Sequence, residues 1–195
     1  MKVIGNPSAL QKLAFVNPSA VKQQGTTRDI YHYVPFAPAQ KGYEFFADLN
    51  NTKALFKNID QNKLTTGEAL VVKRINLKYI ATNPVDDEMV QSIGNLSRGF
   101  LGNIIGGKLD LVVGNQTIIK DLSLIKAKPF CRMHSTDEGT FIDLESEIVI
   151  PKDVEFKVVI KQLANGAAPQ LGFPKFWLGV HLEGYGKILS LDRTI

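Results

Sequence analysis

Residues 68–80, EALVVKRINLKYI, decide the fold class of this chain. Their second half alternates between the apolar side chains Ile75, Leu77 and Tyr79 and the polar side chains Asn76 and Lys78. A period of two residues is that of a strand with one buried face, and an amphipathic helix does not produce it. Residues 70–72 are apolar on both faces, which predicts that the strand begins between two layers. A strand of this length spans ~40 Å, so we expect a bend or bulge within it.

The same alternation recurs along most of the chain. The other predicted strands lie at 29–36, 43–49, 108–119 with a hairpin turn at Gly114-Asn115, 122–125, 129–134, 140–150, 154–160 and 176–182. Pro35 and Pro38 restrict the first of them to an edge or a strand end. Many strands with little helix predict an all-β fold, a two-sheet antiparallel sandwich. Long cross-connections favour a jelly-roll or Greek-key order, although the sequence does not fix the strand order.

Composition places the chain among ordinary globular proteins. It has 195 residues, of which 44% are hydrophobic and 22% charged, enough for one sandwich domain with a stable core. A single cysteine excludes an internal disulfide and favours a reducing compartment. No apolar run approaches the roughly 18 residues that a membrane-spanning helix needs, and the first residues lack the continuous apolar core of a secretory signal. We therefore expect no membrane association.

The net charge of +4 is concentrated at the beginning of the chain. Four basic residues precede the first acid, Asp29: Lys2, Lys12, Lys22 and Arg28. The remaining 19 basic residues balance the 19 acidic ones, so the rest of the chain is neutral. Residues 137–155 have the opposite local balance, with seven acids and Lys152 as their one base. The molecule is therefore polarised, which either reflects two solvated faces or supports association between them.

The basic leader carries a short repeat, NPSAL at residues 6–10 and NPSAV at residues 17–21. Asparagine caps a helix and proline suits its first position, so each copy predicts a short helical turn. Such turns are too short to be stable alone, which predicts that they pack on the domain or on a neighbour unless the terminus is frayed. We divide the chain into a basic arm, residues 1–28, and one β-sandwich domain, residues 29–195.

Motifs that carry catalysis are absent from the sequence. Nucleophile elbows, phosphate-binding glycine loops and dinucleotide fingerprints do not occur. Cys131 and His134 have the spacing of half a zinc site, but no second pair completes it. Asp143, Glu145 and Glu147 share one face of a predicted strand, where they form either a solvated surface or a site for a hard cation such as calcium. We expect no catalytic residue, no cofactor and no metal.

The sequence resembles the jelly-roll structural proteins of virus particles, in particular bacteriophage capsid, vertex or decoration proteins. The resemblance rests on the basic arm, on LTTGEALVVKRINLKYIAT at residues 64–82 and on IPKDVEFKVVI at residues 150–160. It implies a virion protein made in the cytoplasm of the host cell, whose arm reaches a neighbouring subunit or the packaged genome. Four charges without clustered arginines give only weak, salt-sensitive attraction to nucleic acid, so we favour a protein neighbour.

The expected function is therefore that of a self-assembling structural protein, with homo-oligomers and other virion proteins as its partners. The residues assigned to the subunit or nucleic-acid contact are Lys2, Leu10, Lys12, Leu13, Phe15, Lys22 and Arg28, and the acidic strip that could receive them is Asp143, Glu145 and Glu147. The alternative is a carbohydrate-binding module whose Trp177, Tyr185 or Tyr31/Tyr33 pair stacks on sugar. An enzyme using Asp143, Glu145 or His181 is the weakest hypothesis, because no nucleophile and base are paired in the sequence.

Overall fold

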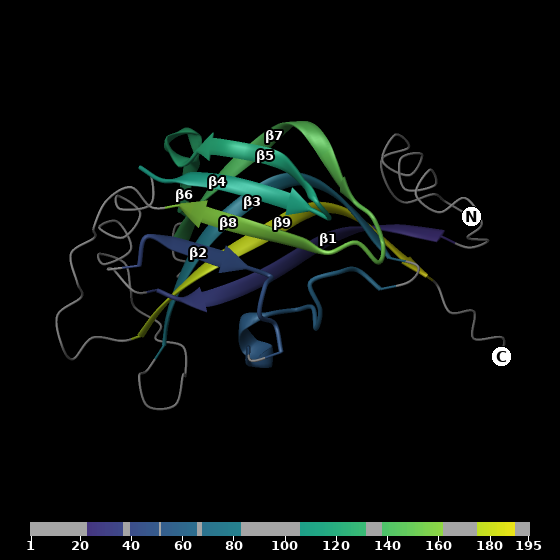
Figure 1. Cartoon of the computed structure of the whole chain (residues 1–195), viewed down its shortest axis with the longest axis horizontal. Helices are drawn as coiled ribbons and strands as arrows, with labels where there is room; N and C mark the ends of the chain where they lie inside the picture. The colour runs from purple at the N-terminus through teal and green to yellow at the C-terminus, as the bar shows by residue number, and fades with distance from the viewer. Residues whose placement is uncertain are drawn as a thin grey trace.

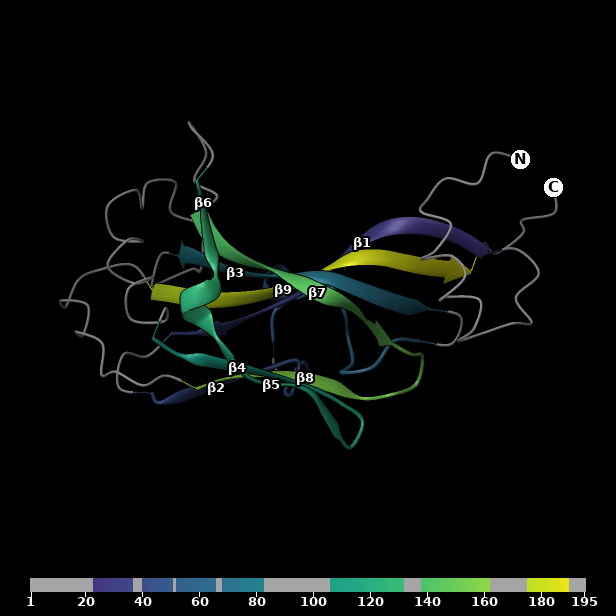
Figure 2. The same cartoon turned by 90° about the horizontal axis from the view of Figure 1, so that it is seen from above.

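A computed structural model of the chain describes seven stretches of it. These are residues 23–36, 40–50, 52–65, 68–82, 106–131, 138–161 and 175–189. Within them the chain folds into two antiparallel sheets that face each other, as predicted (Figures 1 and 2). The helical turns predicted for the arm lie outside the described residues.

The described residues form nine strands and two short 3₁₀ turns. The five-stranded sheet has the order β1 (Gln23–Pro35), β9 (Lys175–Leu189), β3 (Ala69–Thr82), β7 (Glu138–Ile150) and β6 (Lys128–Cys131). The four-stranded sheet has the order β2 (Gly42–Phe45), β8 (Phe156–Lys161), β4 (Lys108–Val113) and β5 (Gln116–Ser123). The 3₁₀ turns are η1 (Ala54–Phe56) and η2 (Leu124–Lys126). Of the strand predicted at 122–125, the first two residues end β5 and the last two lie in η2.

Strand β3 is the middle strand of the five-stranded sheet, as its alternation predicted. The expected irregularity is also present, because the register of β3 with both neighbours shifts between Val72 and Arg74. Val72 and Ile75 are both fully buried although they are three residues apart. Side chains three apart on a regular strand would point to opposite faces, so the bulge at Lys73 is what lets both halves of β3 face the core.

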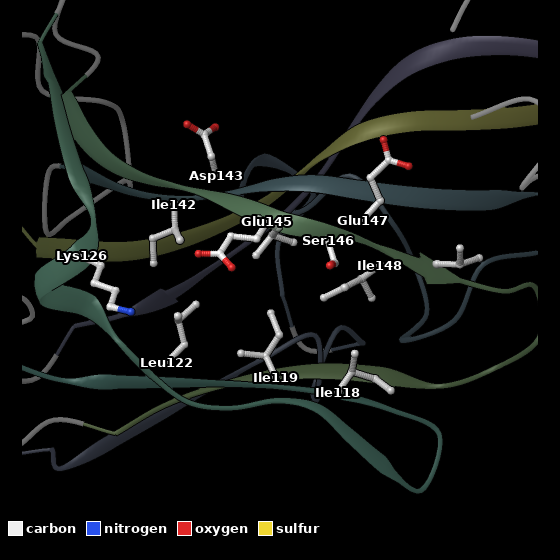
Figure 3. Close-up of a pocket in the computed structure, with 12 residues that line it drawn as sticks. Ile118, Ile119, Leu122, Lys126, Ile142, Asp143, Glu145, Ser146, Glu147 and Ile148 are labelled. Carbon is white, nitrogen blue, oxygen red and sulfur yellow. The ribbon is translucent and has the colours of Figure 1, made fainter. Parts of the chain in front are cut away.

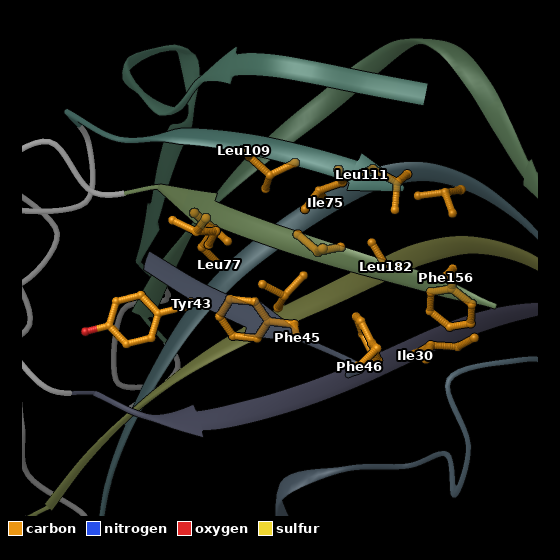
Figure 4. Packing of buried hydrophobic residues seen from close by; sticks show 14 of the residues in the cluster. Ile30, Tyr43, Phe45, Phe46, Ile75, Leu77, Leu109, Leu111, Phe156 and Leu182 are labelled. Carbon is orange, nitrogen blue, oxygen red and sulfur yellow. The ribbon is translucent and has the colours of Figure 1, made fainter. Parts of the chain in front are cut away.

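The core fills the space between the two sheets (Figure 4). Its aromatic part includes Phe45, Phe46 and Phe156, and aliphatic side chains such as Ile75 and Leu182 pack on it from the five-stranded sheet. In β8 every second residue is buried, which is the pattern that the sequence predicted. The domain is therefore held together by apolar burial between two layers.

The strands pair in a nested order that the sequence did not reveal. β1 pairs with β9, β2 with β8, β3 with β7, and β4 with β5, all antiparallel. The innermost pair is closed by the predicted hairpin turn, where Gly114 has a φ of +59°. Such nesting results when one long antiparallel ribbon folds over on itself. Successive pairs of strands then lie in alternate sheets. The short β6 adds one strand beside β7.

The boundary predicted between arm and domain is wrong in position. Strand β1 begins at Gln23, which pairs with Leu189 of β9, and the ladder continues without interruption to Pro35. Residues 23–28 therefore belong to the sheet, because β9 extends beyond the predicted 176–182 and offers them a partner. Strand β1 lies at the edge of its sheet, as Pro35 predicted.

Candidate assembly surface

Most residues that the sequence assigns to the subunit contact precede the described part of the chain. They are Lys2, Leu10, Lys12, Leu13, Phe15 and Lys22. Arg28 is different, because it lies within β1, where its Nη2 donates a hydrogen bond to Glu68 Oε1 at 3.1 Å. Both side chains are mostly buried. Arg28 thus ties β1 to the residue that precedes β3, and we assign it to the fold and not to the arm.

The Glu68 carboxylate is a fixed partner for this arginine. Burial alone raises the pKa of Glu68, but hydrogen bonds from Thr65 together with the charge of Arg28 outweigh burial and lower the pKa below its usual value. The backbone N–H of Thr65 donates to Glu68 Oε2 at 3.1 Å. The carboxylate is therefore charged at neutral pH and the pair persists there.

Strand β7, which carries the three acids of the predicted strip, is interrupted by a bulge. Asp143 lies opposite Arg74 of β3, and the next paired residue, Ile148, lies opposite Val72. Between these two pairs, β3 advances by two residues and β7 by five. Residues 144–147 are therefore not paired with β3. A bulge of this kind breaks the strict alternation of side chains between the two faces of a strand.

The bulge divides the predicted acidic strip. Figure 3 shows the carboxylates of Asp143 and Glu147 on one side of the β7 ribbon and that of Glu145 on the other side, toward β5. Asp143 accepts a hydrogen bond from Arg74 Nε at 2.7 Å, so its charge is already paired. In the described part of the chain, no three His, Cys, Asp or Glu side chains gather closely enough to hold a metal ion. The three acids are thus divided between the two sides of the β7 ribbon, and one of them is already paired.

An apolar groove of about 660 Å³ opens between β7 and β5, at the side of the sandwich opposite β1 and β2 (Figure 3). Its apolar lining is Ile118, Ile119 and Leu122 from β5 and Ile142, Leu144, Ile148 and Val149 from β7. Its charged lining is Lys126, Asp143, Glu145 and Glu147. Ile118 is 45% exposed, so part of this apolar surface faces solvent. Contiguous apolar surface on a folded domain is typical of interaction sites.

The strand edges beside the groove are poor templates for a further strand. On β5, Asp121 has a φ of 52°, and the register with β4 shifts twice. The backbone N–H of Asp121 donates to the carboxylate of Asp110 at 2.6 Å, which holds this irregular backbone in place. On β7, the bulge at 144–147 interrupts the other edge. Bulges and charges on edge strands prevent pairing with other chains, so a partner in this groove has to bind through side chains.

The aromatic residues proposed for sugar stacking are engaged within the domain. The Trp177 ring stacks on Phe56 with centroids 3.8 Å apart, and Lys175 Nζ lies 4.5 Å from the Trp177 ring centre. The indole N–H donates to Thr82 Oγ1 at 2.9 Å. Lys73 Nζ lies 5.0 Å from the ring centre of Tyr185. A sugar would have to displace these contacts, so the described residues do not favour the carbohydrate-binding alternative.

A buried polar chain on the outer face of the five-stranded sheet was missed by sequence reasoning. Asp29 Oδ2 lies 2.8 Å from His181 Nδ1, and His181 Nε2 lies 2.8 Å from the Tyr33 hydroxyl. Tyr31 stacks on the imidazole at 5.1 Å. An imidazole between a carboxylate and a phenol can relay a proton, but His181 and Tyr33 are buried here and fix one another across β1 and β9. Asp29 and His181 are 152 residues apart, so no local pattern could have linked them.

Two further findings bear on the function of the chain. No helix in the described ranges is long and apolar enough to cross a membrane. In comparisons with known proteins, no family model matches the chain, and neither a curated protein nor a solved structure matches it. Its function therefore has to be argued from its own residues.

Proposed function

We propose that this chain is a structural subunit of a virus particle, of the capsid, vertex or decoration type found in bacteriophages. It assembles with copies of itself and with other virion proteins, and its basic N-terminal arm contacts a neighbouring subunit. It is made in the host cytoplasm and resides in the virion.

The nested strand pairing is the observation that carries this proposal. Strands β1:β9, β2:β8, β3:β7 and β4:β5 pair as in a rolled-up ribbon, with the members of successive pairs in alternate sheets. This order supports a jelly roll, an eight-stranded double-sheet architecture that is used by viral capsid proteins and also by lectins and cupins. The fold alone does not define a function, and a structural subunit also requires a surface suited to assembly.

The groove between β5 and β7 supplies such a surface. It presents apolar side chains at the open side of the sandwich, whereas the aromatic rings that a lectin would use are engaged internally. With Arg28 held by Glu68, the arm keeps the basic residues Lys2, Lys12 and Lys22. Three dispersed lysines contribute little to nucleic-acid binding, which leaves a protein neighbour as the favoured partner.

The proposal predicts that removal of the arm abolishes assembly without unfolding the domain. The deletion has to end at residue 22, because a deletion to residue 28 would remove paired residues of β1 and the Arg28–Glu68 ion pair. We expect light scattering to give a multiple of the monomer mass for the intact chain and the monomer mass for the chain that begins at Gln23. Fluorescence of Trp177, the single tryptophan, reports whether each form is folded. An intact chain that stays monomeric at every concentration contradicts the proposal.

A further inference from the structure

We infer that the groove between β5 and β7 of one copy receives the arm of a second copy, with Leu10 and Leu13 as the inserted side chains. This inference rests on the proposed function and names the receptor that the arm uses. The acids of the predicted receptor are part of the lining of this groove.

The floor of the groove is continuous with the core. Ile119, Leu122, Leu144 and Ile148 are half-buried and pack against the buried core residues, and Figure 3 shows Ile119, Leu122 and Ile148 directed into the space between β5 and β7. Ile118 lies at its rim. A side chain that enters the groove therefore extends an existing apolar contact, and the apolar surface it buries stabilises the complex.

The shape of the groove edges selects the kind of occupant. Because Asp121 and the bulge at 144–147 interrupt both edge strands, an added strand would find few regular backbone partners. An amphipathic helical segment needs no such partners, since it binds through side chains spaced three, four and seven residues apart. The arm offers this spacing after its Asn6-Pro7 helix start, with Ala9, Leu10, Leu13 and Val16.

Charge favours the same occupant. Asp143, Glu145 and Glu147 of β7 all line the groove together with Lys126, and Asp143 is paired with Arg74. The arm brings Lys12 between Leu10 and Leu13, so a cation accompanies the apolar side chains to an acidic rim. Complementary charges of this kind guide encounter and orientation, whereas the apolar side chains supply the affinity.

Gln23, where the arm joins β1, lies on the sheet edge opposite the groove. Strand β1 lies at one edge of the five-stranded sheet, and β7 is three strand spacings away, ~14 Å across the sheet. The arm thus leaves the domain at the edge remote from the groove. When the arm of one copy binds the groove of another, the two contacting surfaces are different. Contacts between different surfaces close into rings or extend into larger assemblies. If the arm instead docks in the groove of its own chain, no assembly results. Mixing and cross-linking of variants distinguish docking within one chain from docking between chains.

Aspartate at the groove rim is expected to block assembly of the full-length chain. We expect Ile118→Asp to raise the concentration needed for assembly by at least about tenfold, the equivalent of roughly 1.4 kcal/mol. Leu13→Asp should have the same effect from the arm side. Ile125→Asp is the matched control, because Ile125 is also exposed, at 71%, but does not line the groove. Trp177 fluorescence should be unchanged in all three variants. If Leu13→Asp blocks assembly and Ile118→Asp does not, the inference is overturned while the proposed function stands.

Mixing and cross-linking identify the copy that supplies the arm. A mixture of Leu13→Asp and Ile118→Asp chains should regain part of the assembly, since each chain retains the element that the other lacks. In a Cys131→Ser background, Leu13→Cys and Ile118→Cys chains should form a disulfide-linked dimer on mild oxidation, whereas Leu13→Cys and Ile125→Cys chains should not. A chain carrying both Leu13→Cys and Ile118→Cys that links only within itself overturns the inference. An intact chain that is always monomeric overturns both the inference and the proposed function.

Discussion

Gly184→Ala is expected to prevent stable folding of this domain. A Cβ at Gly184 would lie 1.8 Å from the carbonyl oxygen of Val71 and 2.9 Å from its carbonyl carbon. These are backbone atoms of β3 beside its bulge, so they cannot move without breaking the ladder between β3 and β9. Overpacking against a side chain typically costs about 1–3 kcal/mol, and a backbone clash exceeds this, so we expect a loss of at least about 4 kcal/mol. That is a large part of the roughly 5–15 kcal/mol by which domains are stable.

Gly42→Ala is the matched control for this substitution. Gly42 lies in β2 of the other sheet, where a Cβ would meet the Ile160 carbonyl oxygen at 3.4 Å, close to an ordinary contact. We expect its unfolding free energy to stay within about 1 kcal/mol of the natural chain. Urea unfolding followed by Trp177 fluorescence measures both variants. A Gly184→Ala chain as stable as the Gly42→Ala chain would show that β3 and β9 do not approach as described.

Acidification is expected to destabilise the domain through His32. The pKa of His32 is lowered from 6.5 to about 4, chiefly by burial and also by the nearby charge of Lys57, while the charge of Asp48 partly offsets both. The neutral form is fixed by its partners, because the backbone N–H of Phe46 donates to Nδ1 at 2.8 Å and Nε2–H is left to donate to Thr52 Oγ1. Phe46 has a φ of 64°, so this hydrogen bond also holds an unfavourable backbone conformation.

The direction of the pH effect follows from the lowered pKa. Below about 6.5 the unfolded chain binds a proton at His32, while the folded chain stays neutral until about 4. Stability is therefore complete above pH 6.5 and decreases as the pH falls from about 6.5 to about 4, by up to about 3 kcal/mol. His32→Asn keeps an acceptor for the Phe46 N–H but cannot titrate, so its stability should fall less over this range. Urea unfolding at several pH values compares the two chains, and equal losses would contradict the role of His32.

Local sequence determined each strand whose burial repeats every second residue. The alternation at 75–79 gave the central strand, the length of 68–80 gave its bulge, and Pro35 gave an edge strand. These features depend on which face of one strand is buried, and the alternation of apolar and polar side chains along that strand shows which face it is. The same local reasoning began β1 too late and ended β9 too early, because the two extensions pair with each other.

The candidate assembly surface could be predicted only in part. The basic arm and the acids of β7 are visible in the sequence, and so is the separation of their charges. The groove is not, because Ile118 and Leu144 come from different strands and meet only when β5 and β7 lie on the same open side of the sandwich. The pairing of Arg28 with Glu68 was not visible either, because the two residues are 40 positions apart.

The sequence by itself thus determined the all-β class, the two antiparallel layers and the position of the basic leader, since composition and a two-residue period are local properties. Tertiary structure alone decided the nested strand order, the groove between β5 and β7, the side of β7 on which Glu145 lies, and the link from Asp29 to His181. The physical reason is that alternation specifies inside and outside for one strand at a time, whereas pairing, bulge position and side-chain contacts depend on which distant strands come together.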